Sequence, residues 1–210
     1  MVRSTILSLS LLSCFAGLGY SQVDSARNVI ADFENASEYD APVGVNSELL
    51  FTDFTVVQNV LKTSGGIAAS ALLPVTADIN PPALEIIYPG SKLDGFKPQE
   101  LKFGCQVHFP GEDAAPMICK IAFTPYVTVS NPDGTQSLQA LEKQEEESYP
   151  GLETSPDGMK KVTFNVSNSI TRLVITVSEN EEFLANLLVG VPGAYYTIVI
   201  DDVKYTITEK

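Results

Sequence analysis

Apolar and polar residues alternate through most of the chain, and this period of two is typical of half-buried β-strands. The clearest run is "ELKFGCQVHF" at 100–109. Its alternate side chains, which we expect on one buried face, are Leu101, Phe103, Cys105, Val107 and Phe109. Turn residues separate such runs, as in "NPDGTQ" at 131–136, where Gly tolerates a positive φ. The pattern therefore predicts strands joined by tight turns.

About ten strands are expected over the length of the chain. The runs with the clearest strand character are 28–34, 49–57, 65–72, 83–88, 100–109, 117–130, 161–167, 170–178 and 195–207. The segment 137–149 has helical propensity, but it follows a hairpin-type turn, and we favour an exposed strand there. A short helix is the alternative at 180–188. Together these elements predict an all-β fold, an antiparallel β-sandwich in a single domain.

The most strand-like stretch is "YYTIVIDDVKYTI" at 195–207, which is rich in Tyr, Ile, Val and Thr. Asp201 and Asp202 lie in its middle, and strict alternation places Asp201 on the face of Val199 and Val203. One of the two aspartates must therefore point toward the buried face. Because a buried carboxylate without a partner is costly, this position needs a compensating group.

The first residues have the features of a secretory signal peptide. Arg3 is followed by an apolar stretch and then by small residues before Gln22. We therefore expect a signal peptide at 1–21, a mature domain at 22–210, and a secreted, extracellular protein. A lipoprotein that carries its lipid on Cys14 is the second interpretation.

The chain is acidic, with a formal net charge of −13 at pH 7. Loss of the signal peptide, which contains Arg3 and no acid, changes this charge from −13 to −14. Such a charge argues against binding to nucleic acid or to anionic membranes. We expect a monomer with neither of these partners, and with acidic groups available for Ca²⁺.

Two cysteines, Cys105 and Cys119, remain once Cys14 leaves with the signal peptide. In an oxidising compartment they are expected to form one disulfide, which we place between neighbouring strands; two buried free thiols are the alternative. Asn35 and Asn165 each begin an N-x-S triplet, which would carry a glycan in a eukaryotic secretory pathway.

The sequence contains little that points to catalysis. The one histidine, His108, has no nucleophile-elbow motif to accompany it, and alternation turns it away from the apolar face of its strand. A glycoside hydrolase needs only two carboxylates, but an acid-x-acid-x-acid strand is missing. Trp is also missing, so Tyr would have to stack on sugar rings, and the candidates near strand ends are Tyr88, Tyr126 and Tyr195.

The two ends of the mature chain carry a resemblance to a known family. "ADFEN" at 31–35 and "YYTIVIDDVKY" at 195–205 resemble the first and last strands of galactose-binding-like jelly-roll domains, the architecture of many carbohydrate-binding modules. Between them, "ELKFGCQVHF", a second cysteine in "MICKIAF" and a polar hairpin resemble small secreted fungal proteins of this type. The resemblance implies a β-sandwich of jelly-roll type.

The resemblance also implies a metal site. In a jelly roll of this kind the first and last strands come together, which would bring Asp32 and Glu34 close to Asp201 and Asp202. Several carboxylates in one place repel each other. A Ca²⁺ ion takes six to eight oxygen ligands and would offset the repulsion, and related modules commonly hold a structural Ca²⁺ at this place. The alternative is that the strand emerges into solvent at Asp201 and both aspartates are hydrated.

These observations favour a secreted, non-catalytic binding module for a glycan or cell-wall polymer, with a structural Ca²⁺ ion. Sugar binding would be weak and would use tyrosines such as Tyr88, Tyr126 or Tyr195. The alternative, which the missing Trp favours, is a secreted interaction or effector-type protein that contacts a host or cell-surface protein and binds no sugar. A carboxylate-based glycoside hydrolase is the third interpretation.

Overall fold

The computed structural model of the chain describes residues 26–36, 38–58, 61, 66–73, 80–141, 145–151, 158–179 and 191–210. Within these residues every regular element is a strand, and no helix that could cross a membrane is found. The strands are β1 (Arg27–Ala31), β2 (Pro42–Asn46), β3 (Leu49–Gln58), β4 (Ile67–Leu72), β5 (Ala83–Glu85), β6 (Leu93–His108), β7 (Ala115–Pro116), β8 (Cys119–Ser130), β9 (Gln136–Ala140), β10 (Glu145–Tyr149), β11 (Lys160–Thr163), β12 (Arg172–Glu179) and β13 (Tyr195–Glu209). The prediction of an all-β chain is confirmed.

The strands follow one hydrogen-bonded path that folds back on itself. Its order is β10-β8-β12-β5-β3-β4-β13-β6-β11, and every pair is antiparallel. Although β6 and β8 are far apart on this path, Phe103 of β6 meets Phe123 of β8 edge to face, with ring centroids 5.8 Å apart. The two halves of the path therefore cover opposite sides of one core, which is the expected antiparallel β-sandwich.

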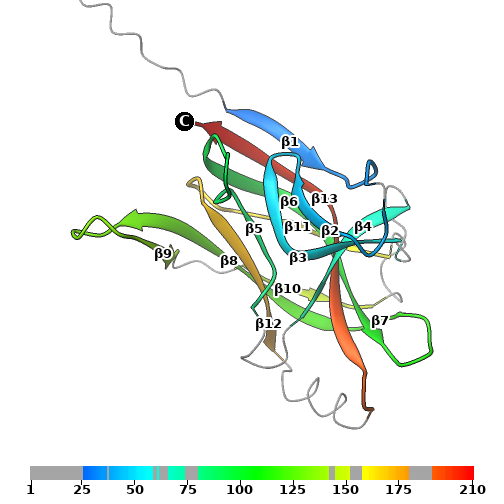
Figure 1. Cartoon of the computed structure of the whole chain (residues 1–210). Coiled ribbons are helices and arrows are strands. Elements are labelled where there is room, and N and C mark those ends of the chain that lie inside the picture. Colours follow the sequence, from blue (N-terminus) through cyan, green and yellow to red (C-terminus); the bar gives the residue numbers. More distant parts are fainter. Residues whose placement is uncertain are drawn as a thin grey trace, which may run out of the picture.

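The first and last strands lie side by side, as they do in a jelly roll (Figure 1). The pairing runs from Arg27 opposite Ile207 to Ala31 opposite Val203. β13 is 15 residues long and also pairs with β4 and with β6, so it lies at the centre of its layer. This pairing ties the two ends of the described domain together.

The alternating pattern predicted the core well and the strand limits less well. Leu101, Phe103 and Cys105 are buried in the main core, as expected for one face of β6. β6 itself begins earlier than predicted, at Leu93, because Pro98 interrupts the strand pattern of its first half. β2 was not predicted, since "PVGVN" contains both Pro and Gly.

The ambiguous segment 137–149 is strand, as we favoured. It forms most of β9 and all of β10. The helix candidate at 180–188 lies outside the described residues.

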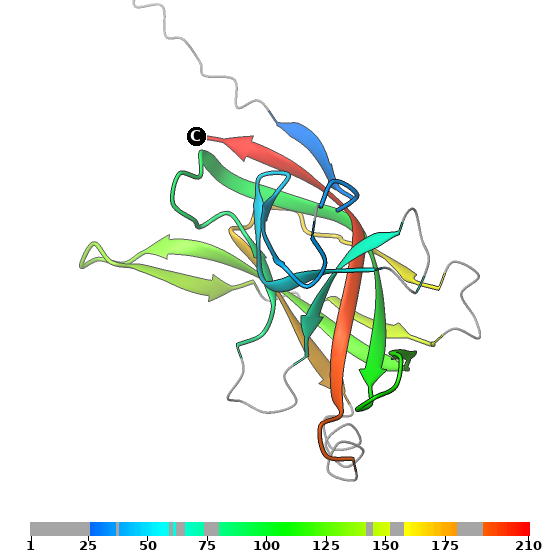
Figure 2. The ribbon, with the colours of Figure 1, turned by 45° about the vertical axis from the view of Figure 1, so that its right-hand side comes forward.

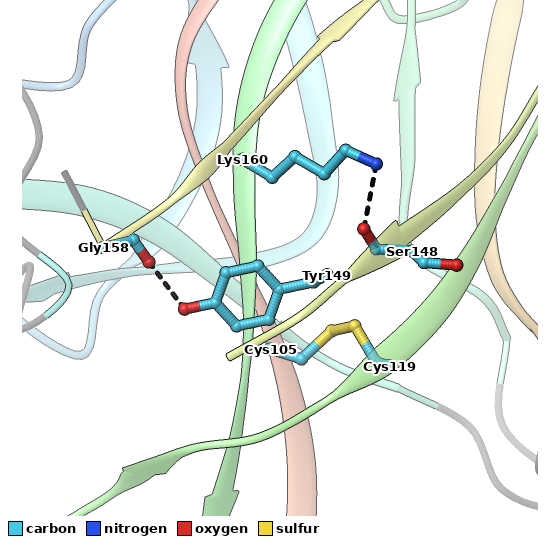
Figure 3. The surroundings of a disulfide bond; sticks show 6 residues. All are labelled: Cys105, Cys119, Ser148, Tyr149, Gly158 and Lys160. Atoms are coloured by element: carbon cyan, nitrogen blue, oxygen red, sulfur yellow. Dashed lines mark hydrogen bonds between the residues drawn. A yellow bond between two sulfur atoms is a disulfide. The ribbon is translucent and has the colours of Figure 1, made fainter. Parts of the chain in front are cut away.

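The disulfide between Cys105 and Cys119 is present, and it joins the two layers (Figure 3). Cys105 lies on β6 and Cys119 begins β8, with their Cα atoms 6.2 Å apart. The prediction that it joins neighbouring strands is wrong, because β6 and β8 face each other across the core and are not paired. Sequence proximity was misleading here: the chain crosses from one layer to the other between the two cysteines.

The aspartate pair in β13 forms a β-bulge. The pairing of β13 with β6 shifts between Asp201 and Lys204, and Asp202 has a positive φ of 47°. Because the bulge inserts a residue, the buried face changes parity. Ile200 and Val203 both lie in the main core, whereas Val199 belongs to a smaller cluster on the other face. The expectation that Val203 shares a face with Val199 is therefore wrong.

Candidate functional site

A hollow of about 410 Å³ lies where the turn after β5 meets the C-terminus. Its volume is within the range of small-molecule sites. Five parts of the chain contribute to it: the turn after β5, the start of β6, the β8–β9 hairpin, the residue before β12, and the last residue. The side chains around it are Ile86, Ile87, Tyr88, Pro89, Ser91, Leu93, Asp94, Thr128, Gln136, Thr171 and Lys210.

The inner side of the hollow combines buried apolar groups with two hydroxyls. Ile86 and Leu93 are buried and supply apolar surface. Thr128 Oγ1 donates to Thr171 Oγ1 over 3.1 Å, and Thr171 Oγ1 donates onward to the carbonyl of Tyr126 over 3.3 Å. The two hydroxyls are therefore fixed in direction, and the oxygen of Thr128 retains acceptor capacity toward a ligand.

The rim of the hollow is polar and carries both charges. Asp94 is an acceptor, Lys210 is a donor, and Gln136 can do both. The position of Lys210 is fixed by its backbone N–H, which donates to the carbonyl of Lys92 over 3.0 Å. Such a rim suits a neutral ligand with many hydroxyl groups better than an ion of either sign.

Tyr88 contributes an aromatic ring whose hydroxyl is already engaged. That hydroxyl donates to the carbonyl of Glu48 over 3.0 Å. Glu48 and Ser47 form the two-residue turn between β2 and β3, and both have positive φ, as a type I′ hairpin requires. Tyr88 is therefore held in a fixed orientation by a turn that is distant in sequence, and its ring remains to contact a ligand.

The three tyrosines predicted to bind sugar do not form one surface. Tyr88 lines the hollow. Tyr126 lies two residues before Thr128 on β8, so alternation places the two side chains on the same face of the strand. Tyr195 begins β13, whose other end leads to Lys210, so about 45 Å of extended strand separate it from the hollow (Figure 1).

Tyr195 instead forms an aromatic pair with His108. The two residues are opposite each other on β13 and β6, and their rings stack with centroids 4.4 Å apart. His108 Nε2 lies 2.9 Å from Thr197 Oγ1, and partial burial lowers the pKa of the imidazole. Since the ring is occupied by Tyr195 and Thr197, a structural role accounts for this histidine.

Comparisons with known proteins give matches among solved structures alone. No family model and no curated protein matches the chain. Among solved structures, one that is similar is the CBM22-1 xylan-binding domain from Paenibacillus barcinonensis Xyn10C. The two are 8% identical with a TM-score of 0.36, and the alignment covers 87% of this chain and 94% of that one. The fold described above rests on the strand pairing of this chain itself.

Two of the four carboxylates expected to bind calcium, Asp201 and Asp202, have partners of other kinds. Asp201 has an exposed fraction of 0%, and its Oδ1 accepts the backbone N–H of Asp202 over 2.8 Å. Asp202 Oδ2 lies 2.8 Å from Lys102 Nζ, on the neighbouring strand β6. Asp32 and Glu34 are exposed beyond the end of β1. One aspartate is thus buried, as expected, and the bulge amide provides part of its compensation.

Calcium binding at these four residues stays a prediction. Among the residues that the structure describes, no group of three or more His, Cys, Asp or Glu side chains is placed to hold a metal ion, so the carboxylates would have to rearrange. Bound Ca²⁺ would stabilise the folded state by about 2.7 kcal/mol at a hundredfold excess over its dissociation constant. Thermal melts in Ca²⁺ and in EDTA, with elemental analysis, decide the matter: equal melting temperatures and no metal would reject the site.

The remaining sequence predictions concern processing. Asn35 and Asn165 are both exposed, so they are accessible to glycosylation, which stays a prediction. The signal peptide at 1–21 and the lipid alternative at Cys14 lie outside the described residues.

Sequence reasoning identified Tyr88 but missed the rest of the hollow. Asp94, Thr128, Gln136, Thr171 and Lys210 form no motif, and only the fold brings them together. A signal was available in "YPGSKLDG" at 88–95, a long polar turn between two buried strands, because binding residues often lie on such loops.

Proposed function

We propose that the protein is a secreted, non-catalytic binding module whose hollow holds one or two sugar units of an extracellular glycan. The observation that carries this proposal is the hollow itself, with apolar surface and fixed hydroxyls inside and acceptors and donors on its rim. A sugar ring has the matching character, since its C–H face suits Tyr88 and its hydroxyls suit Asp94 and Gln136. A structural Ca²⁺ ion at the chain ends belongs to this proposal as a separate element.

The affinity is expected to be weak. The hollow offers one aromatic ring and no Trp, and an aromatic contact contributes about 0.5–1.5 kcal/mol beyond its buried area. A single hollow per chain gives no avidity on a polymer, so tight binding would need more than one copy of the chain to engage the same polymer.

Substitution of Tyr88 tests the hollow directly. Tyr88→Ala is expected to weaken glycan binding about tenfold, because the stacking surface is lost. Tyr88→Phe keeps the ring and loses only the hydrogen bond to the carbonyl of Glu48, so it should bind nearly as well as the wild type. Binding is measured on a glycan array and then by calorimetry on the best ligand.

Two controls accompany this prediction. Tyr195→Ala removes an exposed ring at the far end of β13 and should leave binding unchanged. Thermal melts show whether either Tyr88 variant is less stable than the wild type. Both variants lose the hydrogen bond to Glu48, so any loss of stability from that bond occurs in the Phe variant as well as in the Ala variant. Equal binding by Tyr88→Ala and the wild type would contradict a role for the hollow, and turnover of the bound glycan would contradict a non-catalytic function.

A second function, contact with another protein and no sugar binding, is favoured by one apolar surface. Leu72 of β4 lies directly opposite Thr197 of β13, and Tyr195 lies two residues before Thr197 on the same face. The exposed fractions of Leu72 and Tyr195 are 50% and 45%. If no glycan binds, this surface is the next to test, by substituting both residues and comparing capture of cell-surface proteins.

A further inference from the structure

The β8–β9 hairpin extends away from the rest of the domain (Figures 1 and 2). All five residues of β9 are exposed, so neither face of this strand is covered. Among the strands that the structure describes, β9 pairs with β8 alone, which leaves the hydrogen-bonding groups of its outer edge facing solvent. Free edges of this kind are templates for pairing with another strand.

This edge lacks the protection that several other edge strands have. Residues 121–141 contain a single charged residue, Asp133 in the hairpin turn, although 19% of the chain is charged. The strands at the two ends of the path are charged: β10 carries three glutamates at 145–147 and β11 carries Lys160 and Lys161. β2 begins with Pro42 and has a register shift directly after it. Charges, prolines and bulges are the usual means of blocking edge pairing, and β9 has none of them.

We propose that β9 pairs antiparallel with β9 of a second copy of this chain. A two-fold axis through a five-residue strand places its central residue, Leu138, opposite Leu138 of the partner subunit. Leu138 is 40% exposed, and the pairing would cover two leucines with each other. Since β9 has no charge, the pairing brings no like charges into register, although both copies are acidic overall.

The dimer is expected to be weak. A five-residue edge buries less than the roughly 1,200 Å² of a stable interface, so the dimer should form at high protein concentration and exchange rapidly. Because the interface is uncharged and the two copies repel each other at long range, added salt should strengthen the association. This salt dependence is opposite to that of an interface held by ion pairs.

The geometry also relates the dimer to the hollow. Thr128 and Leu138 are opposite each other on β8 and β9, and Thr128 lines the hollow. An axis perpendicular to the ribbon keeps the same face of both copies on one side, so both hollows would open on that side. If the hollow binds glycan as proposed above, one polymer could reach both; the pairing itself does not depend on that function.

Sedimentation velocity over a range of protein concentrations tests the association. The wild type should shift from monomer toward dimer as concentration rises, and more so in high salt. Leu138→Lys places two lysines opposite each other and should abolish the shift. Ile118→Lys, which makes the same change at a residue that is 65% exposed outside the hairpin, should behave like the wild type.

Cysteine cross-linking tests the register. Opposed residues of an antiparallel pair have Cα atoms about 4.5–5.5 Å apart, which suits a disulfide. Leu138→Cys should therefore form a covalent dimer on mild oxidation. Gln136→Cys should not, because Gln136 would face Ala140 of the partner subunit and lie about 13 Å from its own counterpart.

Three results would overturn the proposal. They are a monomer at every concentration, a dimer that Leu138→Lys leaves unchanged, and a Gln136→Cys variant that cross-links as fast as Leu138→Cys. Because Leu138 is exposed, its substitution should not impair folding, and a thermal melt of each variant checks this.

Discussion

Gly158→Ala is expected to lower the free energy of unfolding by roughly 2–5 kcal/mol. Gly158 has a φ of +72°, where a residue with a Cβ is strained by about 1–2 kcal/mol. A Cβ at this position would also lie 1.7 Å from the carbonyl oxygen of Leu61, so the backbone must move. The carbonyl of Gly158 accepts the buried hydroxyl of Tyr149 over 2.6 Å, and that hydrogen bond would move with it (Figure 3).

Gly134→Ala is the matched control. Gly134 has a φ of +83° in the β8–β9 turn, and a Cβ there meets nothing within 4 Å. The free energy of unfolding of this variant should fall only by the cost of the strained backbone conformation, about 1 kcal/mol. Urea unfolding of both variants measures the difference, and equal losses would show that the contact with Leu61 is unimportant.

The sequence was most informative where alternation is regular. Phe103 and Cys105 are two residues apart on β6, and both lie in the core as the pattern predicts. The resemblance of 31–35 and 195–205 to terminal jelly-roll strands also indicated the pairing of the chain ends, but β1 is Arg27–Ala31, so only Ala31 of the first motif lies in the paired strand. The buried face of a regular strand could be predicted because it is set by parity, whereas the limits of β1 could not.

A bulge removes that regularity and leaves little trace in the sequence. Asp201 and Asp202 looked like one inward and one outward side chain of a continuous strand. In the structure the parity changes there, so Ile200 and Val203 face the same core. Asp tolerates a positive φ such as that of Asp202, but Asp is also common at the ends of regular strands and in turns, so its presence does not indicate a bulge. The pattern alone could not separate these cases.

The hollow could not be predicted for a different reason. Thr128, Thr171 and Lys210 come from separate parts of the chain and are brought together by the path β8-β12-β5 and by the last strand. None of them has a neighbour in sequence that marks a site. Tyr88 was identified for its aromatic ring, whereas its hydrogen bond to Glu48, which fixes that ring, spans forty residues.

The disulfide connects two strands that are not neighbours on the sheet path. Cys105 on β6 and Cys119 on β8 belong to opposite layers, and both are buried. Tyr149 lies beside this bond (Figure 3). Its ring also contacts that of Phe103 on β6, with centroids 6.1 Å apart. β6 and β8 are not paired with each other, although the backbone N–H of Met117, just before β8, donates to the carbonyl of Cys105 over 2.9 Å. The disulfide and side-chain packing add to this hydrogen bond in holding β6 and β8 together.

Reduction of the disulfide is therefore expected to lower the free energy of unfolding by about 3 kcal/mol, the loop-closure contribution for a loop of this size. The two cysteines are 14 residues apart. Urea unfolding of the wild type with and without reductant measures the effect, and thiol alkylation without reductant should modify neither cysteine. A variant with both Cys105→Ala and Cys119→Ala should unfold at the same urea concentration in either buffer, near that of the reduced wild type. If reductant leaves the wild-type midpoint unchanged although both thiols become alkylated, the disulfide contributes nothing to the stability of the folded state.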